Sequence, residues 1–441
     1  MKKISLFLFY SFLFIGAFAQ ELNTQKLDSF FNVLDANKKA MGSMAISKNG
    51  NIIYTKSIGF LDEKKTIAAN AQTKYRIGSI TKMFTATIIF QLIEEKKLTL
   101  ETKLDKYFSQ IPNASKITIG NMLNHRSGIF NITNDTNYLS WCANIISQKE
   151  MIEKIAASPS QFEPNTKTDY SNSNFILLTY IIEKITKKSY SENLSKRIIN
   201  KLQLKNTFYG GKINNANNEA ISFDFDNDSF IKFEPETNMS VPLGAGAIIS
   251  TPSDLTIFIE ALFAKKLVKE TSLQQMKTIV DGMGMGMFTF PFYEHKAFGH
   301  NGGIDGFSSS LGYFPKDSLS FSYCINGSNF KSNDIAVAIL SIYFNRNFTI
   351  SDFKKTATSN VDFVKYIGVY SSLVFPLKIT ISTDGKNLFA QATGQGSFPL
   401  EHTSNNTFTF ETAGIELIFD TEKEEMILKQ SGRSFTLKKE K

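Results

Sequence analysis

The spacing of hydrophobic and polar residues changes near residue 350 of this 441-residue chain. Before that point, apolar residues recur three and four positions apart, as on one face of a helix. The helices that this spacing predicts span residues 20–40, 80–96 and 174–187. Apolar segments on both sides of an Asn49-Gly50 turn predict an antiparallel hairpin at residues 44–54. Strand-like segments at 244–250 and 306–325 add further strands to the same region.

Beyond Lys365 the pattern is that of β-strands throughout. Short alternating segments, such as Lys378–Ser382 and Thr407–Phe410, follow one another at steps of about ten residues. Short strands at that spacing are typical of a small barrel or sandwich. We therefore expect one domain over residues 20–350 and a separate C-terminal β domain over residues 351–441.

The first residues of the chain have the pattern of a secretory signal peptide. Lys2 and Lys3 precede an apolar run, and Ala17-Phe18-Ala19 offers a small-x-small cleavage site. The run is shorter than the roughly 20 residues that a membrane span needs. We expect residues 1–19 to be removed, leaving an exported protein that is periplasmic or secreted and has no integral membrane segment.

Composition excludes several classes of function. Hydrophobic residues make up 42% of the chain and charged residues 20%, which are globular values. The net charge is +8, but the basic residues form no long run, so no nucleic-acid partner is expected. Four histidines and two cysteines are too few for a zinc ribbon or finger, and no metal is expected. Cys142 and Cys324 are predicted to be buried and unpaired.

The segment Gly78-Ser79-Ile80-Thr81-Lys82 carries the first candidate for chemistry. It lies where a helix is predicted to begin, and residues three apart share a helix face, so the Lys82 amine would lie beside the Ser79 hydroxyl. A serine hydroxyl becomes a nucleophile only when a neighbouring base takes its proton. A lysine becomes such a base when burial or positive neighbours lower its pKa. The S-x-x-K pattern is short enough to recur by chance, so further motifs are needed to support it.

Two later segments supply such motifs. Tyr170 and Asn172 stand just before a predicted helix, where they could place a phenol and a carboxamide in a cleft. The segment His300-Asn301-Gly302-Gly303 is predicted to open a strand, and its glycines would let a substrate run along the strand edge. Taken alone, each segment is more typical of an ordinary turn than of a functional site.

Taken together, in this order and spacing, the three segments resemble those of the serine β-lactamase and penicillin-binding-protein superfamily. The resemblance is to its class C branch, which also holds D-alanyl-D-alanine carboxypeptidases, D-aminopeptidases and esterases. Segments Leu123–Ile129 and Gly244–Leu255 match further motifs of that branch. The resemblance covers roughly residues 24–345, and the β tail resembles the lipocalin-like extension of many relatives.

The resemblance implies an α/β (α+β) fold, in which an antiparallel sheet flanked by helices carries an inserted all-helical lobe. It implies that Ser79 is the acylated nucleophile and that Lys82 and Tyr170 share the proton transfers. The backbone N–H groups of Ser79 and Gly303 would form the oxyanion hole, so no cofactor is implied. The residues that it implies for substrate binding are Asn172, His300, Asn301 and Gly302. His125 would be structural, bonding within its loop.

The third motif departs from that of β-lactamases, which commonly carry Lys-Thr-Gly where this chain has His300-Asn301-Gly302. The lysine ammonium attracts a substrate carboxylate, whereas a histidine near its reference pKa of about 6.5 is mostly neutral at pH 7. This difference favours peptides, amides or esters over efficient β-lactam turnover.

The leading hypothesis is therefore an exported serine hydrolase that forms an acyl-enzyme on Ser79. Its expected substrates are D-amino-acid-containing peptides, cleaved in a carboxypeptidase-like manner, or small esters and amides. Hydrolysis of β-lactams is an alternative within the same chemistry, and a non-catalytic penicillin- or ligand-binding protein of the same fold is another. The natural substrate, the oligomeric state and the purpose of the β tail stay open.

Overall fold

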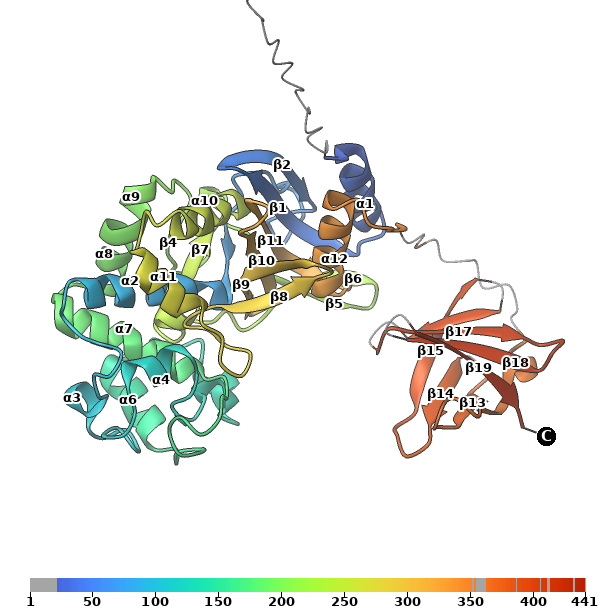
Figure 1. The fold of residues 1–441 in the computed structure, drawn as a ribbon. Coiled ribbons are helices and arrows are strands. Elements are labelled where there is room, and N and C mark those ends of the chain that lie inside the picture. Colours follow the sequence, from blue (N-terminus) through green and yellow to red (C-terminus); the bar gives the residue numbers. More distant parts are fainter. Residues whose placement is uncertain are drawn as a thin grey trace, which may run out of the picture. The chain divides into compact units, whose positions relative to one another are not determined.

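The structure is a computed structural model that describes residues 22–350, 353, 362–385, 387–404, 406–410, 413–430 and 433–440. The predicted signal peptide, residues 1–19, lies outside these described residues. The chain divides into two compact units, one ending at Ile350 and the other beginning at Ser351 (Figure 1). Each unit has a hydrophobic core of its own.

The first unit is built on a six-stranded antiparallel sheet in the order β2-β1-β11-β10-β9-β8. Its strands are β1 (Ala40–Lys48), β2 (Asn51–Ile58), β8 (Phe288–Phe292), β9 (His295–Ile304), β10 (Phe307–Phe314) and β11 (Leu319–Ser328). The β1–β2 hairpin confirms the predicted one. Asn49 and Gly50 make its turn with positive φ angles of 52° and 82°, which asparagine and glycine tolerate best.

Helices cover both faces of this sheet, as Figure 1 shows. On β11, the Ser320 hydroxyl donates to Glu260 of α10 (Pro252–Phe263) at 2.7 Å, and the Tyr323 hydroxyl donates to the backbone oxygen of Ser332 at 2.8 Å. Residues 320 and 323 point to opposite faces of a strand. Ser332 begins α12 (Ser332–Tyr343), which contacts α1 (Thr24–Ala36). Cover on both faces explains why β1 and β11 are buried along almost their whole length.

The chain between β2 and β8 forms the helical lobe and two small sheets. Its long helices, α2 (Thr81–Glu94) and α7 (Asn172–Thr186), confirm two of the predicted helices. The shorter helices are α3 (Asp105–Phe108), α4 (Ile119–Leu123), α5 (Tyr138–Trp141), α6 (Gln148–Ala156), α8 (Tyr190–Leu194), α9 (Asn200–Leu202) and α11 (Glu270–Lys277). The small sheets join β3 (Tyr75–Arg76), β7 (Ile248–Ser250) and β4 (Phe208–Tyr209), and separately β5 (Phe223–Asp226) and β6 (Ser229–Lys232).

Helix α2 is buried on almost every side, although its sequence was expected to give one broad apolar face. Its residues from Thr81 to Phe90 are all buried, and Phe84 stacks on Phe258 of α10 with ring centroids 3.7 Å apart. Helix α7 packs against it from the helical lobe. A helix enclosed in this way is a rigid support for the residues that precede it.

The second unit is a closed barrel of eight antiparallel strands, which decides between the predicted barrel and sandwich. The strands are β12 (Gly368–Ser371), β13 (Ile379–Thr383), β14 (Leu388–Ala392), β15 (Phe398–Ser404), β16 (Thr407–Phe410), β17 (Ile415–Asp420), β18 (Glu425–Gln430) and β19 (Arg433–Lys439). Every second residue of β13 and β14 is buried in the barrel core, as the alternating sequence predicts.

The described residues also bear on three expectations of the sequence. None of their helices has the length and apolar character to cross a bilayer. Cys142 and Cys324 are buried and free, as predicted. The described part of the chain contains no group of three or more histidine, cysteine or acidic side chains placed to hold a metal ion.

Candidate active site

Ser79 lies in a short 3-10 turn, η1 (Gly78–Ile80), which leads directly into α2. The turn begins with Gly78 at a φ of 49°, a conformation that side chains disfavour. One helical turn on, the Lys82 Nζ donates to the Ser79 Oγ at 2.9 Å. The structure therefore places the amine beside the hydroxyl, and Ser79 itself is partly exposed.

Lys82 is completely buried, and only neutral oxygen atoms accept hydrogen bonds from it. Besides Ser79, its Nζ donates to Asn172 Oδ1 at 2.8 Å and to the backbone oxygen of Ala245 at 2.8 Å. Burial without a carboxylate partner lowers the pKa of Lys82 well below its usual 10.5. A neutral amine retains the lone pair with which it can take a proton from Ser79.

Tyr170 reaches the same hydroxyl from the segment before α7. Its Oη donates to Ser79 Oγ at 2.8 Å, and its ring centroid lies 4.9 Å from the Lys82 Nζ. Burial raises the pKa of Tyr170, which keeps the phenol protonated. The ring stacks on His125 with centroids 4.3 Å apart. His125 in turn accepts the Ser171 backbone N–H at 3.2 Å, so it supports the segment that carries Tyr170 and not only its own loop.

Asn172 is held with its oxygen toward Lys82. Its side-chain Nδ2 donates to Asn131 Oδ1 at 3.2 Å and to Thr133 Oγ1 at 3.1 Å. Its backbone N–H donates to the same Asn131 oxygen at 2.9 Å. These contacts fix the orientation of the amide, so a carbonyl oxygen always faces the Lys82 amine.

The segment His300-Asn301-Gly302-Gly303 lies in the last half of β9 and does not open a strand, contrary to expectation. His300 is buried, and its Nδ1 lies 2.5 Å from the Asn301 backbone oxygen. Burial lowers the pKa of His300 to about 3, with Lys82 adding to the effect, so the ring is neutral at neutral pH. Its centroid lies 6.3 Å from that of Tyr170. Asn301 is exposed, and its Oδ1 accepts the Ser310 hydroxyl at 2.8 Å.

Gly302 of β9 and Gly78 of η1 let the two elements lie directly against each other. A Cβ on Gly302 would lie 2.0 Å from the Ile77 backbone oxygen, and a Cβ on Gly78 would lie 2.8 Å from the Gly303 nitrogen. Strand β8 pairs with β9 only as far as Gly299, so the residues of β9 after Gly299 have no β8 neighbour. The backbones that carry the Ser79 and Gly303 N–H groups are thereby brought together beside the Ser79 hydroxyl, as an oxyanion hole requires.

An apolar chamber of about 260 Å³ opens beside Ser79. Asn172 and Gly303 line it at the Ser79 end, whereas most of its wall is aliphatic and aromatic. The larger apolar side chains are Ile132, Leu139, Ile176, Phe233, Val241 and Ile304. Among the described residues that line it, none is basic, and Asp305 is the only acidic one. Such a wall favours an uncharged, apolar ligand group.

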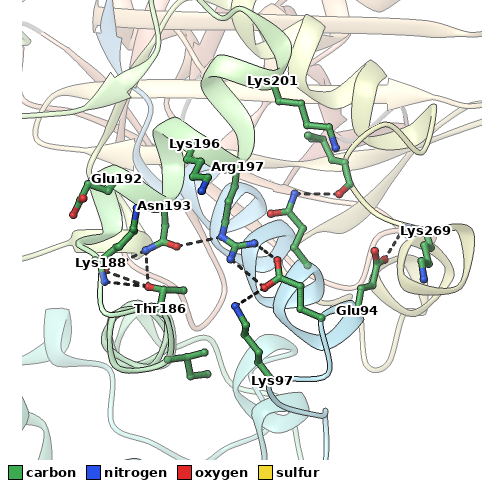
Figure 2. A pocket seen from close by; sticks show the side chains of 14 residues that line it. Glu94, Lys97, Thr186, Lys188, Glu192, Asn193, Lys196, Arg197, Lys201 and Lys269 are labelled. Atoms are coloured by element: carbon green, nitrogen blue, oxygen red, sulfur yellow. Dashed lines mark hydrogen bonds and ion pairs between the residues drawn. The ribbon is translucent and has the colours of Figure 1, made fainter.

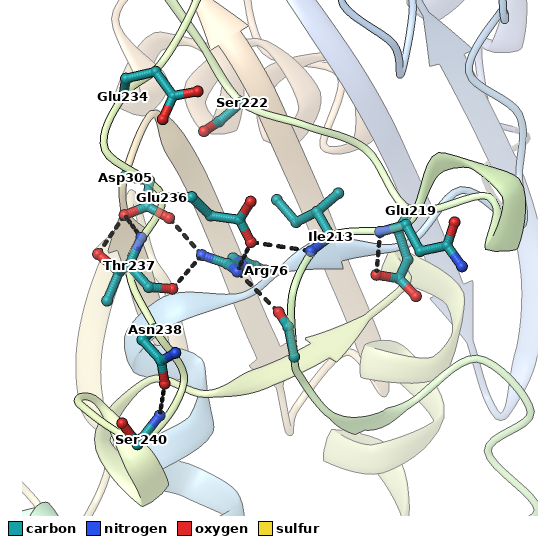
Figure 3. A network of polar contacts seen from close by, with 12 residues as sticks. Arg76, Ile213, Glu219, Ser222, Glu234, Glu236, Thr237, Asn238, Ser240 and Asp305 are labelled. Carbon is teal, nitrogen blue, oxygen red and sulfur yellow. Dashed lines mark hydrogen bonds and ion pairs between the residues drawn. The ribbon is translucent and has the colours of Figure 1, made fainter. Parts of the chain in front are cut away.

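Two residues of the chamber wall, Thr237 and Asp305, belong to a largely buried ion network around Arg76 (Figure 3). The Arg76 guanidinium donates to Asp305 Oδ2 at 2.7 Å, to Glu236, and to the backbone oxygens of Thr237 and Gly211 at 2.9 and 3.0 Å. Asp305 therefore lines the chamber while its carboxylate is bound to Arg76. Its charge is already matched by the guanidinium.

A second, larger hollow of about 720 Å³ lies at the C-terminal end of α2, away from Ser79. Basic side chains from several helices surround it, as Figure 2 shows. Arg197 pairs there with Glu95 at 2.6 Å, and this pairing lowers the Glu95 pKa to about 2. The hollow contains no counterpart of the Ser79 arrangement among its lining residues, so the chamber beside Ser79 is the better candidate for acyl chemistry.

The chain belongs to the Beta-lactamase family, whose sequence profile matches residues 28–357. The match covers nearly all of the described first unit, including every side chain of the Ser79 site. It confirms the resemblance that the three motifs carry.

Curated relatives share a modest part of the sequence. Protein flp of Staphylococcus aureus (strain MW2) is 30% identical over 295 residues, which are 62% of this chain and 57% of that protein. Penicillin-binding protein 4* of Bacillus subtilis (strain 168) is 26% identical over 429 residues, or 89% of this chain and 93% of that protein. Teichoic acid D-alanine hydrolase of Staphylococcus aureus (strain MRSA252) is 26% identical over 226 residues, covering 51% and 55%. The chain thus spans little more than half the length of the first and third of these relatives.

Solved structures confirm the predicted fold. The D-amino acid amidase from Ochrobactrum anthropi SV3 matches with a TM-score of 0.65 and 24% identity over 73% of this chain and 99% of that chain. The octameric penicillin-binding protein homologue from Pyrococcus abyssi matches with a TM-score of 0.69 and 22% identity over 95% of this chain and 100% of that chain. The second match extends over most of the chain, including the C-terminal unit.

Proposed function

We propose that this protein is a serine hydrolase that cleaves amides or esters without a free carboxylate through an acyl-enzyme on Ser79. The observation that carries the proposal is the hydroxyl of Ser79, which lies 2.9 Å from the Lys82 amine and 2.8 Å from the Tyr170 phenol. These groups come from two segments far apart in the sequence.

The protonation states suggest how the two groups divide the work. The Ser79 oxygen forms a bond to the substrate carbonyl carbon while the neutral Lys82 amine accepts its proton. The N–H groups of Ser79 and Gly303 stabilise the negative charge on the carbonyl oxygen. The Tyr170 phenol donates its proton to the leaving nitrogen or oxygen, whose bond to carbon breaks. The proton that Lys82 took from Ser79 then passes to the Tyr170 oxygen, since both groups lie at the same Ser79 oxygen.

A water molecule then completes the cycle by the reverse route. It attacks the carbonyl carbon of the acyl-enzyme and gives its proton to the Lys82–Tyr170 pair. The bond to the Ser79 oxygen breaks, the hydroxyl recovers its proton and the free acid leaves. Every proton that the first half-reaction consumes is returned by the second.

The chamber supports an apolar acyl group without a carboxylate near the scissile bond. No lysine or arginine lines the chamber among the described residues, and His300 is held neutral by burial. A peptide that ends in a free carboxylate would find no cation there to bind it. Amides and esters of D-amino acids lack that carboxylate, and the names of two relatives, the D-amino acid amidase and the teichoic acid D-alanine hydrolase, support substrates of this kind.

The first experiment tests the nucleophile. A fluorophosphonate probe should label the protein on Ser79, because the neutral Lys82 amine and the oxyanion-hole N–H groups favour attack on phosphorus. The Ser79→Ala variant should lose all labelling, whereas Ser191→Ala, at an exposed serine of α8, should label like the wild type. Equal labelling of the Ser79→Ala variant would show that the nucleophile lies elsewhere.

The same preparation then separates the substrate classes. p-Nitrophenyl esters of apolar acids and D-alanine amide should be turned over faster than a D-alanyl-D-alanine peptide with a free carboxylate. Nitrocefin reports β-lactam turnover in parallel, and faster hydrolysis of nitrocefin than of every ester would contradict the proposed preference. A protein that is labelled by no probe and cleaves no substrate would instead be a binding protein of this fold.

A further inference from the structure

The proposed oxyanion hole depends on how closely two distant segments approach each other. The Ser79 N–H lies in η1, three residues after Arg76 of β3. The Gly303 N–H lies near the end of β9, two residues before Asp305 in the β9–β10 turn. The sheet does not pair β3 with β9, so the separation of the two segments is set by the backbone packing of η1 on β9 and by side-chain contacts.

Two such contacts join the segments on either side of the N–H pair. On one side, the Ser309 hydroxyl of β10 donates to the Ile77 backbone oxygen at 2.9 Å. On the other side, Arg76 Nη1 donates to Asp305 Oδ2 at 2.7 Å. The second contact joins one charged residue from each of the two segments that carry the N–H groups.

The Arg76–Asp305 pair is buried, and a ring of hydrogen bonds with Thr237 holds it. The side chains of Arg76 and Asp305 are 1% and 4% exposed, so water cannot replace either partner. The other Asp305 oxygen accepts the Thr237 hydroxyl at 2.6 Å and the Thr237 N–H at 3.3 Å. The Thr237 backbone oxygen accepts from Arg76 at 2.9 Å, which completes a ring of three residues. Both terminal nitrogens of Arg76 and both oxygens of Asp305 are hydrogen-bonded, whereas Arg76 Nε has no partner among the described residues. A buried ion pair held by this many bonds has few alternative geometries.

We infer that the Arg76–Asp305 ion pair sets the spacing of the two oxyanion-hole N–H groups, which makes Arg76 and Asp305 positioning residues for the proposed reaction. The inference rests on the proposed function. The pair does not touch the reacting atoms. The ion pair holds η1 and the end of β9 at the separation at which both N–H groups reach one oxyanion. Hydrogen-bond donors to an oxyanion lose their effect when they are displaced by about 1 Å.

Glu236 provides a matched comparison within the same network (Figure 3). It also accepts from the Arg76 guanidinium, and it also accepts a backbone N–H, that of Ile213 at 3.0 Å. Its side chain is 26% exposed, and it stands on the loop before Thr237, away from β9. Neutralising Glu236 therefore removes one of the two carboxylate charges bound to Arg76 and leaves the Asp305 bond, on the β9 side of the oxyanion hole, in place.

The experiment compares Asp305→Asn with Glu236→Gln, using a p-nitrophenyl ester and a phosphonate inhibitor whose oxygen occupies the oxyanion hole. Asp305→Asn should lower kcat about 100-fold with KM within threefold of the wild type, and it should slow phosphonylation to a similar degree. Glu236→Gln should leave kcat within threefold. Circular dichroism and thermal melting show that each variant is folded.

Thr237→Val serves if Asp305→Asn does not fold, because it removes one hydroxyl from the ring and keeps the ion pair. It should lower kcat about tenfold without a matching rise in KM. Three results would overturn the inference: a wild-type kcat in folded Asp305→Asn, an equal loss in Glu236→Gln, or a rise in KM alone, which would make Asp305 a substrate-binding residue.

Failure of the proposed function would give a different result. In that case the wild type itself would neither turn over the ester nor react with the phosphonate. The variants are therefore informative only against an active wild type, and a positioning role is rejected only when the wild type reacts and folded Asp305→Asn reacts equally well.

Discussion

At the scale of single residues, burial controls the protonation of each basic group around Ser79. Lys82 and His300 are both enclosed, and burial is the main cause that lowers the pKa of each. His300 also lies near the Lys82 amine, which adds to its shift. Tyr170, with its raised pKa, is held in the opposite, protonated state. Burial therefore favours the uncharged form of Lys82, keeps His300 neutral and keeps the Tyr170 phenol protonated, which suits proton transfer near neutral pH.

His300 should make the first unit sensitive to acid. Its pKa is about 3 in the folded protein and 6.5 ordinarily, so the unfolded chain binds the extra proton first. Its contribution to stability is complete above pH 6.5 and is lost as the pH falls toward 3. At pH 5 the loss is about 2 kcal/mol. His300→Gln should therefore lose less unfolding free energy than the wild type between pH 7.5 and 5.

Urea denaturation followed by tryptophan fluorescence measures this difference. Trp141 is the single tryptophan of the chain and is buried in the first unit, so its signal reports that unit. His125 remains in the variant and keeps its own acid sensitivity, because burial also lowers its pKa. His402→Gln, in the barrel, is the control. An unchanged pH dependence in His300→Gln would contradict the assignment of this loss to His300.

At the scale of secondary-structure elements, contact between η1 and β9 matters most. The turn that carries Ser79 lies between a fully enclosed helix and a strand end that has no β8 neighbour. Backbone atoms of the two elements approach more closely than side chains would permit, and Gly78 and Gly302 make that approach possible. The shape of the site is thus fixed by main-chain packing as well as by the polar side chains.

Gly302→Ala should separate these elements. Its Cβ would lie 2.0 Å from the Ile77 oxygen and 2.4 Å from the Ser309 hydroxyl, so β9 must move away from η1. We expect kcat for a p-nitrophenyl ester to fall about 100-fold, with a lower melting temperature. Gly211→Ala is the matched control, because nothing lies within 4 Å of a Cβ at that position. Wild-type kcat in Gly302→Ala would mean that the approach is not needed.

At the scale of the whole molecule, the two units have separate cores. All residues of the Ser79 site and its chamber lie between residues 76 and 305. The barrel closes through pairing of β12 with β19, so its strands complete one another. Neither unit takes a strand of its sheets from the other.

A chain that ends after Ile350 should therefore fold and react. Its turnover of a p-nitrophenyl ester should remain within about twofold of that of the longer chain, and its Trp141 fluorescence melt should be unchanged, because domains with their own cores fold independently. Expression of the truncated chain from Gln20, with kcat and KM measured beside the longer protein, provides the test. Loss of solubility or of turnover would show that the barrel supports the first unit.

The sequence was sufficient to predict those parts of the site that belong to local motifs. Ser79 and Lys82 lie one helical turn apart, and Tyr170 lies two residues before Asn172, which begins α7. Spacing placed each pair together, and the resemblance to the family singled these residues out. The strand containing His300 was misplaced, because glycine at three of five consecutive positions from Gly299 suggested a turn. Those glycines instead permit close packing inside a strand.

Other parts of the site left no pattern to find. The Ala245 group that binds Lys82 is a backbone oxygen, which any residue would supply. Arg76 and Asp305 meet only after the sheet has formed, and no periodicity marks them as partners. The chamber likewise combines side chains from segments that are separated by more than a hundred residues. Only tertiary structure brings such residues together.

The composition of the chamber has a consequence for how such a protein can diversify. The groups that move protons sit on η1, α2 and the segment before α7. Of the chamber residues, Leu139 belongs to the short helix α5, Phe233 to the loop after β6 and Ile304 to the last position of β9. Replacing these three residues would reshape the cavity while the proton-transfer machinery stays in place. Selectivity and reactivity can therefore evolve, or be engineered, as two largely independent traits.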